Sequence, residues 1–147
     1  MISHVYGAIL LNEHRETVIV KGRKSQKWSL PKGHGKSQEK PLDACIRELK
    51  EETGVNMIGI TPDDEVRFQS GTYFVFFVNE RLLLDPEDSE EIEKAMWISI
   101  SRIPYVSSNK DLKSFSKCIN IDSIIEKIQN KRLQVPVQTL ATFNAQL

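Results

Sequence analysis

Three glutamates, Glu48, Glu51 and Glu52, lie close together in the first half of the chain. Their spacing makes them neighbours on the surface of an α-helix, where like charges destabilise the helix by about 0.2–0.5 kcal/mol per pair. A hard divalent cation reverses this repulsion, because magnesium prefers oxygen ligands and also binds substrate phosphates. The cluster therefore indicates either metal-dependent chemistry on phosphate groups or a solvated acidic helix face.

The segment around these glutamates has the start and stop signals of a helix. Pro41 suits a first helical position, where no backbone N–H is needed, and Gly54 suits the left-handed residue that ends a helix. At about 100° per residue, one side of this helix is mostly apolar. That side consists of Leu42, Cys45, Ile46, Leu49 and Thr53. We therefore predict a helix over 41–53 with one buried face and one acidic face.

A basic run without acidic residues precedes this helix. It contains Lys21, Arg23, Lys24, Lys27, Lys32 and Lys36, with His34 among them. The glycines at 22, 33 and 35 predict that much of the run is loop. The run is either a solvated face or, next to a metal-binding helix, a binding site for phosphates. The candidate substrate-binding residues are Lys21, Arg23, Lys24, Lys27, Lys32 and His34.

The stretch from Gly33 to Val55 resembles the defining box of the Nudix hydrolases, G-x5-E-x7-R-E-U-x-E-E-x-G-U, where U is aliphatic. Every fixed position matches: Gly33, Glu39, Arg47, Glu48, Leu49, Glu51, Glu52, Gly54 and Val55. The preceding Trp28–Lys32 is also similar to the segment that usually leads into the box. A looser similarity extends from Tyr6 to Pro104.

The resemblance implies an α/β fold, in which a mixed β-sheet lies between helices and the box forms a loop–helix–loop. It also implies cleavage of a pyrophosphate bond with magnesium or manganese as cofactor. Glu48 and Glu52 are the first candidates for metal ligands, and Glu51 is a third ligand or the general base. Gly33 is expected to bring backbone close to the metal. Glu39 and Arg47 are expected to form a structural ion pair.

An acidic segment later in the chain offers one further ligand. It contains Asp85, Glu87, Asp88, Glu90, Glu91 and Glu93. Nudix enzymes often have a glutamate in this region, followed by an aliphatic residue and later a tryptophan, and Glu91, Ile92 and Trp97 resemble that arrangement. Glu91 is thus a candidate metal ligand, with a solvated loop as the alternative.

Strand and helix patterns complete the domain. Tyr6–Leu11 and Thr17–Val20 predict a hairpin, 66–68 and Tyr73–Val78 predict two more strands, and Met96–Ile100 predicts the last one. The run 73–78 has no polar face, which predicts helices on both sides of the sheet. Ser107–Lys117 is polar, and Asn120 is the expected N-cap of an amphipathic C-terminal helix.

Composition limits the remaining possibilities. With 147 residues and no net charge, we expect one Nudix hydrolase domain over 1–133 and an uncharged tail over 134–147. The two cysteines are too far apart for a metal-ligand spacing or a disulfide framework. The sequence shows neither a signal peptide nor an apolar run long enough for a membrane span, so we expect a cytoplasmic, reducing location. No oligomeric state is indicated.

The substrate that we expect is a small molecule rich in phosphates, either a diphosphoinositol polyphosphate or a dinucleoside polyphosphate. The basic run suits dense negative charge, and Pro31–His34 resembles the asymmetric dinucleoside-tetraphosphate hydrolases. The alternative is hydrolysis of an RNA cap, because Leu30–Gly33 and Ile46–Glu48 resemble mRNA decapping enzymes, although we do not expect their extra N-terminal domain here. A capped RNA needs a longer basic track, for which the candidates are Lys110, Lys113, Lys127, Lys131 and Arg132. A Nudix domain that only binds its ligand is less favoured, since all box glutamates are present.

Overall fold

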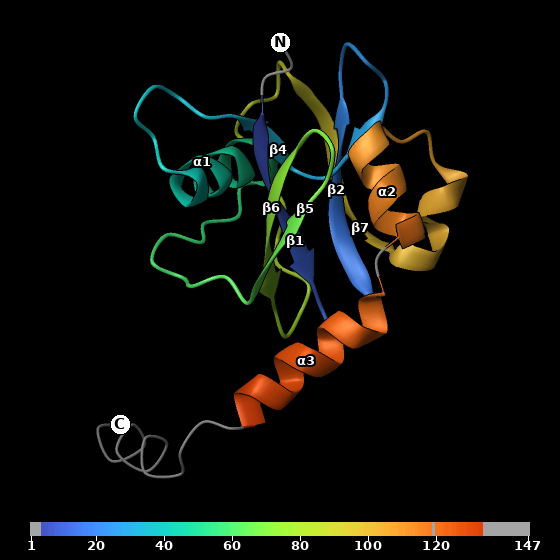
Figure 1. Ribbon diagram of the computed structural model, residues 1–147. Coiled ribbons are helices and arrows are strands. Elements are labelled where there is room, and N and C mark those ends of the chain that lie inside the picture. The colour runs from blue at the N-terminus through green and yellow to red at the C-terminus, as the bar shows by residue number, and fades with distance from the viewer. Residues whose placement is uncertain (1–3, 119, 134–147) are drawn as a thin grey trace.

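The computed structural model describes residues 4–118 and 120–133 (Figure 1). The strands are β1 (Val5–Leu11), β2 (Glu16–Gly22), β3 (Trp28–Ser29), β4 (Lys32–His34), β5 (Asp64–Arg67), β6 (Gly71–Phe77) and β7 (Ile92–Ser99). The helices are α1 (Pro41–Thr53), a 3-10 segment η1 (Ile100–Tyr105), α2 (Lys110–Cys118) and α3 (Ile121–Leu133). The expected tail, 134–147, lies outside the described residues.

The strands form one mixed sheet with the order β3-β2-β1-β6-β5. β4 adds to this path by pairing with β1, and β7 by pairing with β2. Only the central pair β1–β6 is parallel among the described strands, whereas the others are antiparallel. The predicted hairpin of β1 and β2 is confirmed, and so is the mixed sheet between helices.

Helix α1 has the bounds that its start and stop signals predicted. Pro41 is its first residue, and Gly54 follows it in the left-handed conformation with φ of 79°. The N–H of Gly54 donates to the carbonyl of Lys50 at 2.8 Å, which closes the last turn. Cys45 and Leu49 are fully buried on the face that packs against the sheet. This packing fixes the rotation of the helix, and with it the directions of the box glutamates.

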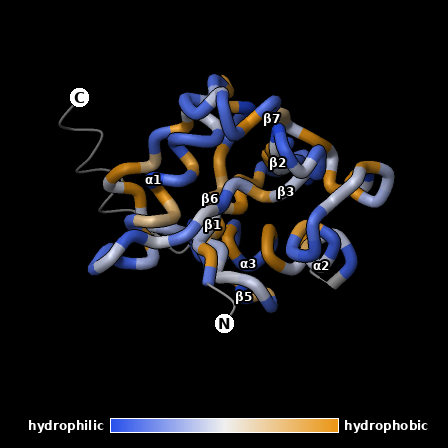
Figure 2. Tube along the Cα trace, turned by 90° about the horizontal axis from the view of Figure 1, so that it is seen from above, coloured by the Kyte–Doolittle hydropathy of each residue, from blue (hydrophilic) through white to orange (hydrophobic). Residues whose placement is uncertain are grey.

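Strand β6 is covered on both faces, as its unbroken apolar run predicted. Tyr73 and Val75 belong to the hydrophobic cluster under α2 and α3, whereas Phe74 and Phe76 belong to the cluster under α1. In Figure 1, α1 lies on one side of the sheet and α2 on the other. Hydrophobic stretches mark the central strands in Figure 2, and more hydrophilic segments surround them.

Sequence patterns missed several elements. The polar segment 107–117 covers all but the last residue of helix α2, and the basic run, much of which was expected to be loop, contains β3 and β4. The strand expected at Met96–Ile100 begins earlier, at Ile92. Strands as short as β3 and β4 have no periodicity of their own, since they form by pairing with β2 and β1. None of the described helices is long and apolar enough to cross a membrane.

Candidate active site

A cleft of about 640 Å³ lies where the β2–β3 turn, helix α1 and the acidic segment meet. Its lining includes basic side chains, those of Arg23, Lys24, Lys27 and Lys32, and acidic ones, those of Glu52, Asp88, Glu90 and Glu91. Gly22, Ser25, Ser29, Ile92 and Asn109 complete the lining. The fold thus brings the two oppositely charged segments of the sequence to a single place.

Glu52 is the buried carboxylate of the cleft. It is only 3% exposed, and one of its oxygens accepts the backbone N–H of Lys32 at 3.1 Å. Burial raises the pKa of Glu52 to about 8, although Lys32 opposes the shift, and the charges of Glu48 and Glu91 raise the pKa further. The expectation that Glu52 lies on an acidic face separate from the buried face was wrong. Glu52 follows Cys45 by nearly two full helical turns, so it lies beside the apolar face.

Glu48 is half-buried, and its carboxylate lies against Gly33. A Cβ atom at Gly33 would come within 2.1 Å of the Glu48 carboxyl carbon, so any larger residue here would have to displace the Glu48 carboxylate. Gly33 was expected to bring backbone close to a metal ion, and in the structure its backbone lies close to the Glu48 carboxylate. Burial raises the pKa of Glu48, Arg47 opposes the shift, and Glu51 and Glu91 add to it.

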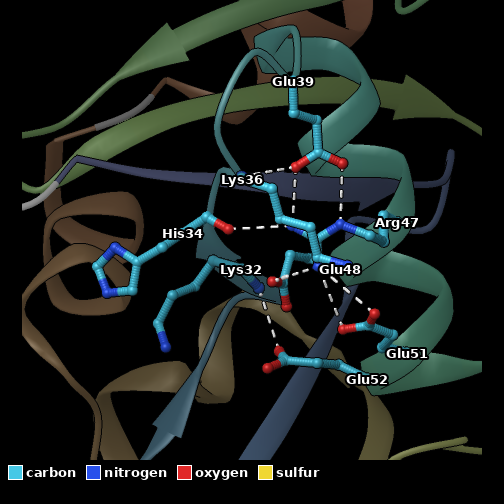
Figure 3. A network of polar contacts seen from close by, with 8 residues as sticks. All are labelled: Lys32, His34, Lys36, Glu39, Arg47, Glu48, Glu51 and Glu52. Carbon is cyan, nitrogen blue, oxygen red and sulfur yellow. Dashed lines mark hydrogen bonds and ion pairs between the residues drawn. The ribbon is translucent and has the colours of Figure 1, made fainter.

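Arg47 links the box loop to the box helix (Figure 3). Its Nε and Nη2 each donate to a different oxygen of Glu39 at 2.9 Å, so the expected ion pair is present. Arg47 also donates to Glu48 at 2.9 Å and to the carbonyl of His34 at 3.0 Å. Glu51 lies 3.4 Å from the same guanidinium and is the most exposed of these three carboxylates. Arg47 therefore restrains two of the candidate metal ligands.

The basic candidates differ in where they lie. Lys24, Lys27 and Lys32 line the cleft, and so does Arg23, whose guanidinium donates to the carbonyl of Ser89. Lys21 and His34 are not among the lining residues. The Nζ of Lys21 lies 3.2 Å from Glu93. Figure 3 shows the exposed His34 ring directed away from the carboxylates.

The carboxylates fit a hard divalent cation by their chemistry, although they are not assembled around one. Among residues 4–118 and 120–133, no three acidic, histidine or cysteine side chains are arranged as a ready metal site. Arg47 holds Glu48 and Glu51, and Glu52 faces a backbone N–H. A buried carboxylate with a raised pKa beside two like charges nonetheless favours a cation, because the cation offsets both repulsion and desolvation.

Asn109 lines the cleft, although no sequence pattern marked it as a site residue. Asn109 precedes helix α2, and its side-chain oxygen accepts the N–H of Leu112 at 2.9 Å as an N-cap. Its backbone N–H donates to the carbonyl of Trp28 at 2.9 Å, which places the start of α2 beside the cleft. An asparagine three residues before a buried leucine was the available signal for this cap.

Comparison with known proteins places the chain in a family. The family model described as the NUDIX domain matches residues 3–117. The m7GpppN-mRNA hydrolase of Saccharomyces cerevisiae is 30% identical over 118 residues, which cover 76% of this chain and 12% of that protein. The m7GpppN-mRNA hydrolase dcap-2 of Caenorhabditis elegans is 34% identical over 109 residues, 67% of this chain and 14% of the relative. The chain thus spans only a small part of the length of these relatives.

Solved structures share the fold. The Ap4A hydrolase of C. elegans, in a binary complex, superimposes with a TM-score of 0.61 at 19% identity, covering 76% of this chain and 95% of that one. A bifunctional NMN adenylyltransferase/ADP ribose pyrophosphatase from Francisella tularensis, complexed with AMP and a manganese ion, gives a TM-score of 0.66 at 20% identity. The match covers 87% of this chain and 42% of that one. With the box helix, the mixed sheet and the family match in agreement, the chain belongs to the Nudix hydrolase family.

Proposed function

We propose that this protein hydrolyses a phosphoanhydride bond in a polyphosphate-rich small molecule, with magnesium or manganese as cofactor. The observation that carries the proposal is the cleft, which brings Lys24, Lys27 and Lys32 together with the buried Glu52 and the exposed Glu91. The cations suit substrate phosphates, and the carboxylates suit a metal ion that binds the same phosphates.

The lining of the cleft favours phosphate recognition over base recognition. None of the lining residues in the described part of the chain is aromatic, and Ile92 is the single large apolar residue among them. Stacking on aromatic rings is the usual means of binding a base. A diphosphoinositol polyphosphate needs no stacking, and a dinucleoside polyphosphate presents a dense run of phosphates to the same lysines.

The chain's own residues divide the work of the reaction. Glu48, Glu52 and Glu91 are the proposed metal-binding carboxylates, and Lys24, Lys27 and Lys32 bind and orient the phosphates. When bound, the divalent cation lowers the pKa of water and neutralises charge that develops on the phosphoryl oxygens. Glu52 must lose its proton to bind a cation near neutral pH, because burial raises its pKa to about 8.

Glu51 is the proposed proton acceptor for the attacking water. It is more exposed than Glu48 and contacts Arg47 only at 3.4 Å, so its carboxylate is the freest of the box glutamates to move toward water. Arg47 contacts four groups of the box and serves to position Glu48 and Glu51.

A second candidate function is cleavage of an RNA cap, and the observation that favours it is the similarity to curated m7GpppN-mRNA hydrolases. Of the expected basic track, Lys110 and Lys113 lie on α2, which begins directly after the cleft-lining Asn109. Lys127 and Arg132 instead contact Asp64 and Asp63 on and beside β5. An RNA leaving the cleft would therefore follow α2 rather than α3.

Parallel assays of metal-dependent product release test both functions. The substrates are a diphosphoinositol polyphosphate, a dinucleoside polyphosphate and a capped RNA, each with the parent protein, Lys24→Glu and the pair Lys110→Glu/Lys113→Glu. A compact substrate predicts turnover of a small molecule that Lys24→Glu cripples and the α2 pair spares. Decapping with negligible turnover of both small molecules, and sensitivity to the α2 pair, overturns the preferred substrate. No metal-dependent release from any substrate leaves the ligand-binding alternative.

A further inference from the structure

The acidic segment that carries Glu91 is held at one end by the box helix. The N–H of Asp85 donates to the carbonyl of Thr53 at 2.8 Å, and the N–H groups of Glu87 and Asp88 both donate to the carbonyl of Glu51 at 2.9 Å. These bonds satisfy carbonyls at the end of α1 that have no partner within the helix. The first half of the segment is therefore fixed relative to the box glutamates.

The other end of the segment is held by Arg23. The backbone N–H of Arg23 donates to the carbonyl of Glu91 at 2.9 Å. The guanidinium donates to the carbonyl of Ser89 through both Nε, at 3.1 Å, and Nη2, at 2.9 Å. Nη2 also reaches the carbonyl of Ile92 at 3.5 Å. One side chain thus contacts the backbone on both sides of Glu91.

Short-range bonds make this end of the segment a compact turn. A side-chain oxygen of Asp88 accepts the N–H of Glu91 at 3.1 Å, and the carbonyl of Asp88 accepts the N–H of Ile92 at 3.0 Å. Gln26 completes the connection, because its side-chain nitrogen donates to the carbonyl of Arg23 at 2.8 Å and contacts Glu93 at 3.3 Å. The β2–β3 turn and the turn at 88–92 are therefore braced against each other.

We propose that Arg23 is a positioning residue, which holds the turn at 88–92 so that Glu91 faces the cation bound by Glu48 and Glu52. Glu91 and Glu52 line the same cleft, and Arg23 contacts the carbonyls that flank Glu91. This assignment replaces the expectation that Arg23 binds substrate, because its guanidinium already donates to two backbone carbonyls. The inference rests on the proposed function and assigns Lys24, not Arg23, to the phosphates.

The primary experiment measures Mn²⁺ binding without substrate, by the loss of the free-ion electron paramagnetic resonance signal. The variants are Arg23→Ala, Arg23→Lys and Glu91→Gln, with Lys24→Ala as the matched control from the same turn. Groups that orient a metal ligand typically contribute about 10–100-fold in metal affinity, so Arg23→Ala should raise the Mn²⁺ dissociation constant about 10-fold. Arg23→Lys should recover little, because an ammonium cannot reproduce the forked contact. Lys24→Ala should leave Mn²⁺ affinity unchanged and raise KM.

Two further measurements separate positioning from other roles. Hydrogen exchange of the amides at 88–92 should accelerate in Arg23→Ala and not in Lys24→Ala, whether or not turnover is detected. In the Arg23→Ala/Glu91→Gln double variant, the loss of Mn²⁺ affinity should be less than the combined losses of the single variants. Equal Mn²⁺ affinity in the parent and Arg23→Ala overturns this inference. An Arg23→Ala variant with a raised KM for substrate but unchanged hydrogen exchange at 88–92 also overturns it. Failure of turnover with all substrates, while the Mn²⁺ titrations behave as expected, overturns the proposed function and leaves the role of Arg23 intact.

Discussion

The carboxylate of Glu48 lies so close to the backbone of Gly33 that a Cβ atom there would be 2.1 Å from the Glu48 carboxyl carbon. Gly33→Ala should therefore displace Glu48 and weaken divalent-cation binding about 10-fold or more, with a corresponding loss of turnover at limiting metal. A Mn²⁺ titration measures the effect. Gly35→Ala is the control in the same loop. The nearest atom to a Cβ there would be on the Tyr6 ring, at 3.2 Å, and not on a carboxylate. Equal losses in the two variants would contradict a specific effect on Glu48.

Glu52→Gln should abolish most turnover and yet stabilise the metal-free protein. Burial raises the folded-state pKa of Glu52 from 4.5 to about 8. Above pH 4.5 the unfolded chain releases this proton while the folded protein retains it, so Glu52 destabilises the fold increasingly up to about pH 8. Glutamine can still accept the N–H of Lys32 and carries no charge. Relative to the parent, we expect a gain of about 1–3 kcal/mol in the free energy of unfolding at pH 8 and little gain at pH 4.

Thermal or urea unfolding in chelator, repeated at both pH values, measures this difference. Added Mn²⁺ should reverse the order, because ligand binding stabilises a folded protein that binds it and Glu52→Gln lacks a ligand. A variant less stable than the parent at pH 8 in chelator would show that Glu52 is not held as a buried, protonated acid.

Glu39→Gln should destabilise the protein in a pH-dependent way. The hydrogen bonds from Arg47, followed by that from the backbone of Lys36, lower the pKa of Glu39 from 4.5 to about 2. The stabilisation is therefore complete above pH 4.5 and disappears as the pH falls toward 2. Melting curves from pH 7 to pH 2 should show the largest difference between variant and parent at pH 7 and convergence near pH 2. A constant difference at all pH values would mean that Glu39 contributes through packing rather than charge.

Tyr73→Phe should destabilise the protein without touching the cleft. The Tyr73 hydroxyl donates to the buried carboxylate of Asp111 at 2.6 Å, which ties α2 to β6. Removing the hydroxyl leaves a buried acceptor without this partner, which costs about 1–3 kcal/mol. Tyr105→Phe is the control, because that side chain is 88% exposed and should change stability by less than about 0.5 kcal/mol. Similar unfolding curves for the two variants would contradict the importance of the buried hydrogen bond.

Local signals in the sequence were sufficient for the box helix and its termini. A proline fixes its own backbone geometry, and a glycine adopts the left-handed turn at no steric cost, so Pro41 and Gly54 mark the ends of α1 without help from the rest of the fold. The ion pair of Glu39 and Arg47 also follows from a motif that spans one loop and one helix. The apolar run of β6 predicted helices on both faces, because such a strand needs cover on each.

Long-range contacts decided the parts of the site that the sequence could not. Glu52 and Glu48 are both carboxylates on α1. The rotation of the helix against the sheet buries Glu52 and places Glu48 against Gly33. No sequence pattern distinguishes Arg23 from the lysines beside it. Its contact with Ser89 exists because β2 and β7 pair in the sheet and bring two distant turns together. Composition determined that basic and acidic segments are present, whereas tertiary structure determined which charges face the cleft, because strand pairing joins residues that no local pattern connects.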